Sequence, residues 1–222
     1  MSLTSERYED ETAALRRCVR LVVLLYSAEG AGLTPLAILR LHTLAYLSNV
    51  LAPVWDMPPL DGKVLKRSGG PFYPALQRDL DRLVGMGVVI ISGLGHVQDE
   101  DGRWRLEGSY RLNQPFANPI VETLVHFEDE RRVVAFVQEL AFALSALGDE
   151  ELDIAMKQDA TYSDSLVGVG NVVDFDEWQK KNYAANAARY FEGLLPGGAS
   201  ATPGEQLHFY IRHLHARTLG ER

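Results

Sequence analysis

The stretch GGPFYPALQRDLDRLVGMGVVIISGLGHVQDEDGRWRLEGSYRL, residues 69–112, decides the fold. A Gly-Gly-Pro turn opens it, and a proline in the first turn followed by periodic leucines predicts a helix over about 74–86. The β-branched run 88–91 is typical of a buried strand. Residues 99–102 have the composition of a hairpin turn, and Trp104 begins a returning strand. The stretch therefore predicts a turn, a helix and a β-hairpin.

Two further helices are predicted before this stretch. Over about 9–28, apolar residues recur every three or four positions, and Gly30 ends that helix. The pair Thr34-Pro35 predicts the N-cap and first residue of a second helix that runs to about residue 50. The proline-bearing segment 51–66 is predicted to be a loop with extended pieces. Three helices and a hairpin in this order indicate a winged helix-turn-helix, embellished by the long loop.

The second half of the chain is predicted to be helical. Helix starts and apolar periodicity place helices at about 118–147, 149–157, 174–195 and 203–218, and Thr202 with Glu205 predicts a capping box at the start of the last one. The fold class is therefore mainly α with a small β-hairpin, an embellished winged helix-turn-helix followed by a helical C-terminal half. We predict a winged-helix domain over 1–115, a helical domain over 116–196, and a linker with a C-terminal helix over 197–222.

Composition and charge narrow the class of protein. The chain is 46% hydrophobic and 23% charged, which is ordinary for a folded protein, and its formal net charge is −8. That acidity disfavours a protein that binds DNA unaided. The sequence lacks both a membrane-length apolar run and a signal peptide, so we expect a cytoplasmic protein with no membrane partner. The single cysteine, Cys18, is expected to be a buried thiol.

Known catalytic patterns are missing from the sequence. It has no Walker loop, no Rossmann fingerprint, no His-Glu-x-x-His and no Gly-x-Ser-x-Gly. His208 and His215 share a helix face while His213 points elsewhere, with no carboxylate nearby in sequence, so we expect no metal site. Asp174 and Asp176 are explained as helix caps. We therefore expect a non-enzymatic protein without a cofactor.

Basic residues before and on the predicted third helix are the candidates for contact with DNA or a partner. The set comprises Lys63, Lys66, Arg67, Gln77, Arg78 and Arg82. Arg78 and Arg82 share one face, but Asp79 and Asp81 lie between them, so we expect a nearly neutral helix. The tip of the hairpin is acidic, which does not suit contact with phosphate. Salt bridges within the chain and a protein interface remain the competing explanations.

Aromatic and aliphatic residues form a second set of candidates, for a partner interface. The set comprises Phe72, Tyr73, Trp104, Leu207, Tyr210, Ile211 and Leu214. The three aromatic residues flank the predicted winged module, where such side chains serve as core or interface anchors. The four others form one stripe of the last helix, which follows the predicted linker. That helix either docks on its own domain or binds a partner.

The motifs LLYSAEG, LTPLAILRLHTLAYLSNV and GGPFYPALQRDLDRLVGMGVV, followed by a hairpin, resemble a known family. They are similar to the middle components of bacterial ABC-three-component defence systems, including the Lamassu type. The last motif also resembles, more weakly, the turn and helix of Panacea-type antitoxin domains. The resemblance covers mostly residues 13–112, and the insert 51–66 departs from it.

The resemblance implies an accessory subunit of an antiphage complex. Such a subunit binds and bridges an SMC-like ATPase, has an effector as a further partner, and engages DNA through the complex. The first alternative is a winged-helix transcriptional regulator or antitoxin. The second is an enzyme, which a pocket converging on Asp159, Tyr162 and Asp174 would indicate.

Overall fold

The chain is mainly helical, as predicted, and the structure is a computed structural model. It describes residues 3–60, 63–67, 70–98, 102, 104–159, 161–163, 168–175, 182–195 and 200–220. The described helices are α1 (Leu3–Gly30), α2 (Ile38–Leu51), α3 (Pro74–Gly85), α4 (Gln114–Leu124), α5 (Glu128–Leu144), α6 (Asp149–Gln158), α8 (Tyr183–Tyr190) and α9 (Pro203–Thr218), with short 3-10 helices η1 (Ala52–Trp55) and η3 (Phe191–Leu194). The described strands are β1 (Leu36–Ala37), β2 (Lys63–Arg67), β3 (Gly70–Phe72), β4 (Val89–Gln98), β5 (Trp104–Leu112) and β6 (Val172–Asp174).

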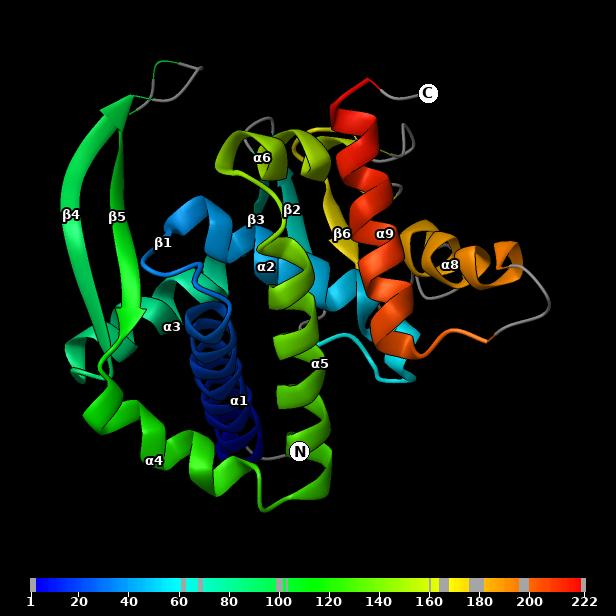
Figure 1. Ribbon diagram of the computed structural model, residues 1–222. Coiled ribbons are helices and arrows are strands. Elements are labelled where there is room, and N and C mark those ends of the chain that lie inside the picture. The colour runs from blue at the N-terminus through cyan, green and yellow to red at the C-terminus, as the bar shows by residue number, and fades with distance from the viewer. Residues whose placement is uncertain are drawn as a thin grey trace.

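Two three-stranded antiparallel sheets are formed by these strands, in the orders β1-β5-β4 and β3-β2-β6. The predicted hairpin is the long pair β4 and β5, which rises away from the helices in Figure 1. Its register slips between Ser92 and Gly95, where Gly93 has a φ of +62° that favours glycine. The acidic turn at 99–101 lies outside the described residues.

The start of the second predicted helix is wrong by three residues. Leu36 and Ala37 are extended and pair with Ser109 and Tyr110 of β5, so α2 begins at Ile38. Pro35 is therefore not the first helical residue. The tertiary pairing with β5 overrides the local cap signal, because it supplies partners for the backbone of this short segment.

Segment 51–66 contains more structure than the predicted loop. It holds η1 and the first residues of β2, and β2 pairs on one side with β3 and on the other with β6. Since β6 comes from the second half of the chain, this sheet ties the two halves together. The predicted helix over 174–195 is wrong at its start, because Asp174 ends β6. Residues 176–181, which include Trp178, lie outside the described residues.

The single long helix predicted from 118 to 147 is wrong, since α4 and α5 are separate. The chain leaves the helical conformation at Phe127, which is extended and is the N-cap of α5, and Glu128, Asp129 and Glu130 suit the first turn of that new helix. At the end of α4 the Thr123 hydroxyl donates to the Pro119 carbonyl at 2.7 Å, and His126 Nδ1 lies 2.7 Å from the Glu122 carbonyl. Pro119 lies inside α4 instead of at a helix start. The chain turns at 125–127 and returns as α5 beside α1 (Figure 1).

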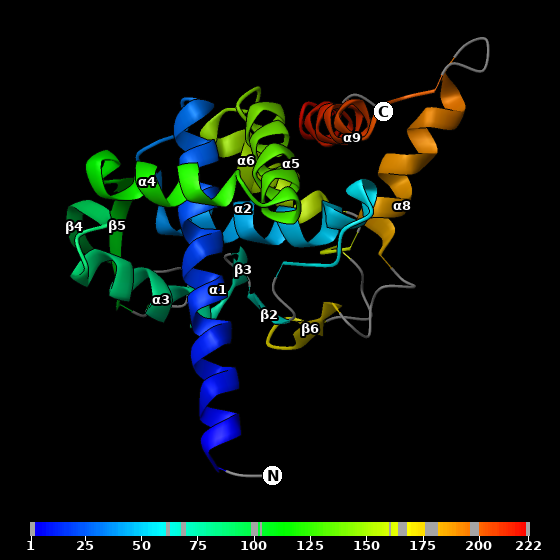
Figure 2. The same cartoon turned by 90° about the horizontal axis from the view of Figure 1, so that it is seen from below.

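One hydrophobic core runs through the molecule and includes residues of α1, α2, α5 and α9. In Figure 2 the N-terminal half of α1 extends beyond this body, while its C-terminal half is buried against α2 and α5. Cys18 is a buried, free thiol, as expected, and burial raises its pKa. Helix α9 packs against α5, α6 and α8.

Candidate docking surfaces

The orientation of α3 separates its four charged residues. Leu76, Leu80 and Leu83 are buried, and Asp79 turns inward with them, where it accepts a hydrogen bond of 2.6 Å from Arg17 Nε. Arg78, Asp81 and Arg82 lie on the exposed side. The outward face is therefore net basic, although the helix as a whole is neutral as expected. Helical spacing alone could not place Asp79 on the inner side of the helix, because its partner Arg17 lies 62 residues away in sequence.

The remaining charged candidates lie on β2, in the other sheet, and each has a partner within the chain. Lys63 forms an ion pair of 3.0 Å with Asp174. Lys66 Nζ lies 5.1 Å from the centroid of the Tyr162 ring, and the guanidinium of Arg67 lies 3.7 Å from that of Phe72. Gln77, on α3, donates to Asp81 at 3.0 Å. Lys63, Lys66 and Arg67 thus lie on β2, whereas Gln77 lies on α3. All four side chains already make contacts within their own chain.

The three aromatic candidates differ sharply in exposure. Tyr73 is buried and its hydroxyl accepts a hydrogen bond of 2.8 Å from Asn49, so it is a core residue and not an exposed anchor. Phe72 is half-buried against His42, with ring centroids 5.0 Å apart. Trp104 is 69% exposed on β5. Leu94 and Val97 are exposed on β4, so the hairpin presents three large apolar side chains to solvent.

The four candidates on α9 are buried within the chain, which corrects their assignment to a partner interface. Leu207, Tyr210, Ile211 and Leu214 face α5, α6 and α8 and belong to the core. The predicted capping box is confirmed, because Thr202 and Glu205 bond each other's backbone amides. The alternative in which the last helix docks on its own domain is therefore the correct one.

Polar side chains of α9 reach carboxylates that are distant in sequence. His208 Nε2 lies 3.4 Å from Glu139, and His215 Nε2 lies 3.2 Å from Glu151. His213 instead packs against the ring of Phe191. In the described part of the chain, no group of three or more histidine, cysteine, aspartate or glutamate side chains could hold a metal ion.

Asp159 is a buried carboxyl at the point where α2, α9 and the turn after α6 meet. Its oxygens accept hydrogen bonds from the hydroxyls of Tyr46 at 2.8 Å and Tyr210 at 2.6 Å, and from the backbone amides of Thr161 and Tyr162. Burial raises its pKa, while these four donors oppose that shift. The group is fully enclosed, so it crosslinks the fold and does not face a substrate. Asp174 lies elsewhere, in the ion pair with Lys63.

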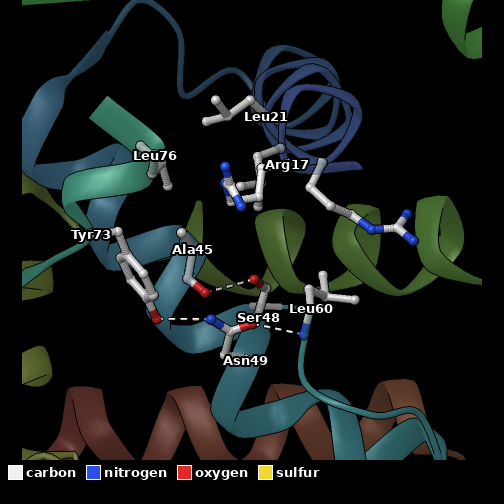
Figure 3. A pocket seen from close by; sticks show the side chains of 10 residues that line it. Arg17, Leu21, Ala45, Ser48, Asn49, Leu60, Tyr73 and Leu76 are labelled. Carbon is white, nitrogen blue, oxygen red and sulfur yellow. Dashed lines mark hydrogen bonds between the residues drawn. The ribbon is translucent and has the colours of Figure 1, made fainter. Parts of the chain in front are cut away.

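A small pocket lies where α1, α2 and α3 meet (Figure 3). Its volume is about 30 Å³. The lining is mainly aliphatic, with polar groups at the base and two arginines of α1 at the rim; it comprises Arg17, Arg20, Leu21, Leu24, Ala45, Ser48, Asn49, Leu60, Tyr73 and Leu76. Sequence reasoning missed this site, because its residues come from four separate segments and none of them forms a motif.

The amide of Asn49 organises the base of this pocket. Its Nδ2 donates to the Tyr73 hydroxyl at 2.8 Å, and its Oδ1 accepts from the backbone amide of Leu60 at 2.8 Å (Figure 3). A buried amide with both ends satisfied holds its neighbours in place. Asn49 therefore fixes the wall formed by Tyr73 and the segment after η1.

Comparison of the chain with protein-family models, with curated proteins and with solved structures found no match. Among the described residues, no helix is both long and apolar enough to cross a membrane.

Proposed function

We propose that this protein is a non-enzymatic winged-helix adaptor that works by docking on larger macromolecules. The order of α1, β1, α2, α3, β4 and β5 supports this, together with the sheet order β1-β5-β4. In a winged helix, three helices are followed by a hairpin whose returning strand lies between the other two strands. The sheet of β2, β3 and β6 is then an insertion between the second and third helices, tied to the C-terminal half.

The exposed apolar hairpin is the observation that carries the proposal. Leu94, Val97 and Trp104 are 57%, 38% and 69% exposed on two strands that extend away from the helices (Figure 1). Aromatic side chains, tryptophan above all, are common anchors of protein interfaces. We therefore assign the hairpin to contact with a protein partner.

Charge supports a protein partner over free DNA. The net charge is −8, and the tip sequence of the hairpin, Asp99-Glu100-Asp101, is acidic. From this acidity and from the resemblance to middle components of ABC-three-component systems, we propose the following partners. They are an SMC-like ATPase and an effector in a cytoplasmic antiphage complex. The protein would bridge the ATPase and engage DNA through the complex, where a basic partner supplies most phosphate contacts.

Co-purification tests this function. The protein is co-expressed with SMC-like ATPases of bacterial defence systems, and the affinity is measured for Trp104→Ala and for Tyr190→Ala. Tyr190, at 67% exposure on α8, is the matched control for Trp104. We expect the tryptophan variant to lose affinity at least about tenfold and the tyrosine variant to keep it. A protein that stays alone in the presence of every such ATPase would show that the proposal is wrong.

A transcriptional regulator or antitoxin is the second candidate, favoured by the outward face of α3. Because Asp79 is turned inward, Arg78 and Arg82 share an exposed face with a single acid, Asp81. Direct DNA binding predicts an affinity that falls steeply with salt and drops further in an Arg78→Ala, Arg82→Ala variant. Binding by the isolated protein with those two properties would favour the regulator over the adaptor.

A further inference from the structure

The pocket between α1, α2 and α3 combines an aliphatic interior with a cationic rim. Leu21, Leu24 and Leu76 form walls from α1 and α3, and Leu60 closes one side. Figure 3 shows Arg17 reaching from α1 into this hollow, above the hydrogen-bonded Asn49. An apolar lining with one positioned polar group is the usual composition of a binding pocket.

Arg17 has binding capacity that its known contact does not use. A guanidinium carries five N–H donors, and among the described residues Arg17 donates only from Nε, to Asp79 at 2.6 Å. That contact occupies one edge of the group and leaves the two Nη atoms at its other end. Arg20, by contrast, uses both of its Nη atoms on Glu130, at 2.5 and 3.2 Å. The Nη end of Arg17 is therefore the part of the rim suited to an added carboxylate.

The size of the pocket limits what enters it. A volume of about 30 Å³ holds roughly two water molecules, since one needs about 10–15 Å³. That room suits the tip of one branched aliphatic side chain and is far too small for a metabolite or nucleotide. A buried aliphatic anchor beside a charge is a common form of protein interface contact.

We propose that this pocket is a docking site for an acidic segment of a protein partner, in which an aliphatic side chain enters between the leucines and an adjacent carboxylate binds the Nη end of Arg17. The inference rests on the proposed adaptor function and adds a second contact, on a different surface from the Trp104 hairpin. Charge complementarity with Arg17 selects an acidic partner segment.

The test uses two dipeptide probes and the full-length protein. Binding of N-acetyl-leucyl-glutamyl amide is followed through the methyl resonances of Leu21, Leu24, Leu60 and Leu76. We expect saturable shifts with a millimolar dissociation constant. The glutaminyl probe should bind about tenfold more weakly, because it keeps the size and loses the charge. Probes that bind equally would overturn the role of Arg17.

Three variants locate the binding. Ala45→Leu fills the pocket from α2 and should abolish the shifts, and its circular dichroism spectrum is compared with that of the native protein to establish that the fold is kept. Arg17→Lys keeps the charge facing Asp79 but loses the two-pronged Nη end, and should weaken binding several-fold. Arg16→Ala removes an exposed positive charge that neighbours Arg17 in sequence but does not line the pocket, and should leave binding unchanged.

Specific outcomes reject the inference independently of the hairpin test. Absence of any probe binding to the native protein, or equal binding by the Ala45→Leu variant, would overturn it. Since the probes need no partner protein, such a result would leave the adaptor function and the effect of Trp104→Ala untouched. Conversely, failure of the co-purification with intact probe binding would reject the adaptor and keep the pocket.

Discussion

At the scale of single residues, buried polar groups fix how distant segments meet. Asp159 joins α2 to α9 through the hydroxyls of Tyr46 and Tyr210. Tyr73 is similarly shared, because its backbone amide donates to His42 and its hydroxyl accepts from Asn49. Removing the partner of such a group should destabilise the fold, because the buried donor or acceptor that remains can form a hydrogen bond neither to water nor to the protein. These residues therefore give the sharpest tests of the structure.

Removal of the Asp159 carboxyl should strongly destabilise the protein. Asp159→Ala leaves four donors without their acceptor, and we expect the free energy of unfolding to fall by about 3–5 kcal/mol. Asp159→Asn keeps one acceptor oxygen and should lose less, about 1–3 kcal/mol. Urea unfolding of both variants measures the difference. Equal stability of native and alanine forms would show that the carboxyl does not link α2 and α9.

His42 should make the stability depend on pH. Burial first, and then the positive charge of Arg67, lower its pKa from 6.5 to about 4. The unfolded state therefore binds more protons between these values, so stability rises with pH through that window and falls as pH drops below 6.5. Between pH 7 and 5 the loss assigned to His42 is about 2 kcal/mol.

The His42→Asn variant isolates this titration. Its side-chain oxygen can still accept the Tyr73 amide, which donates to His42 Nδ1 at 3.2 Å in the native protein. The variant should be less stable at pH 7 because it leaves space unfilled, yet its stability should change less between pH 7 and 5. Chemical denaturation at the two pH values provides the measurement, and an unchanged slope with pH would exclude His42 as its source.

At the scale of elements, the sequence predicted what local chemistry controls. Helix α3, the β4–β5 hairpin and the capping box of α9 follow from prolines, periodic leucines and turn residues at short range. The boundary of α2 depends on long-range pairing with β5, and the break between α4 and α5 lies at Phe127, where the backbone becomes extended. Periodicity could not reveal them, because an apolar stripe continues across a turn as readily as along one helix.

The candidate surfaces show the same limit. Trp104 was proposed from the sequence as a core or interface anchor, and it is exposed. The inward position of Asp79 could not be predicted from local sequence, because it depends on Arg17 from another helix. The stripe on α9 was predicted correctly as apolar, but its position after a linker did not show whether it would be covered. In the structure its own chain covers it.

Leu214 of α9 and Leu219, directly after the helix, test how α9 is held. Leu214 is 2% exposed and Leu219 is 59% exposed. Leu214→Ala should lower the free energy of unfolding by about 2–5 kcal/mol, because it opens a cavity against the core. Leu219→Ala should change it by no more than about 0.5 kcal/mol. Thermal or urea unfolding measures the free energy of unfolding of both variants. A small loss for Leu214→Ala would mean that α9 does not pack against the core as described.

At the scale of the whole molecule, the shared core predicts one cooperative unit. Core residues come from all three segments of the predicted division, 1–115, 116–196 and 197–222, and β6 joins the sheet formed by β2 and β3. Removing any segment would expose apolar surface on the others, so partial unfolding should cost nearly as much as global unfolding. Hydrogen exchange of the amides of Leu24, Val137 and Ile211, one from each segment, measures this directly. We expect the three opening free energies to agree within about 1 kcal/mol. Three distinct values that follow the segment boundaries would instead establish separate domains.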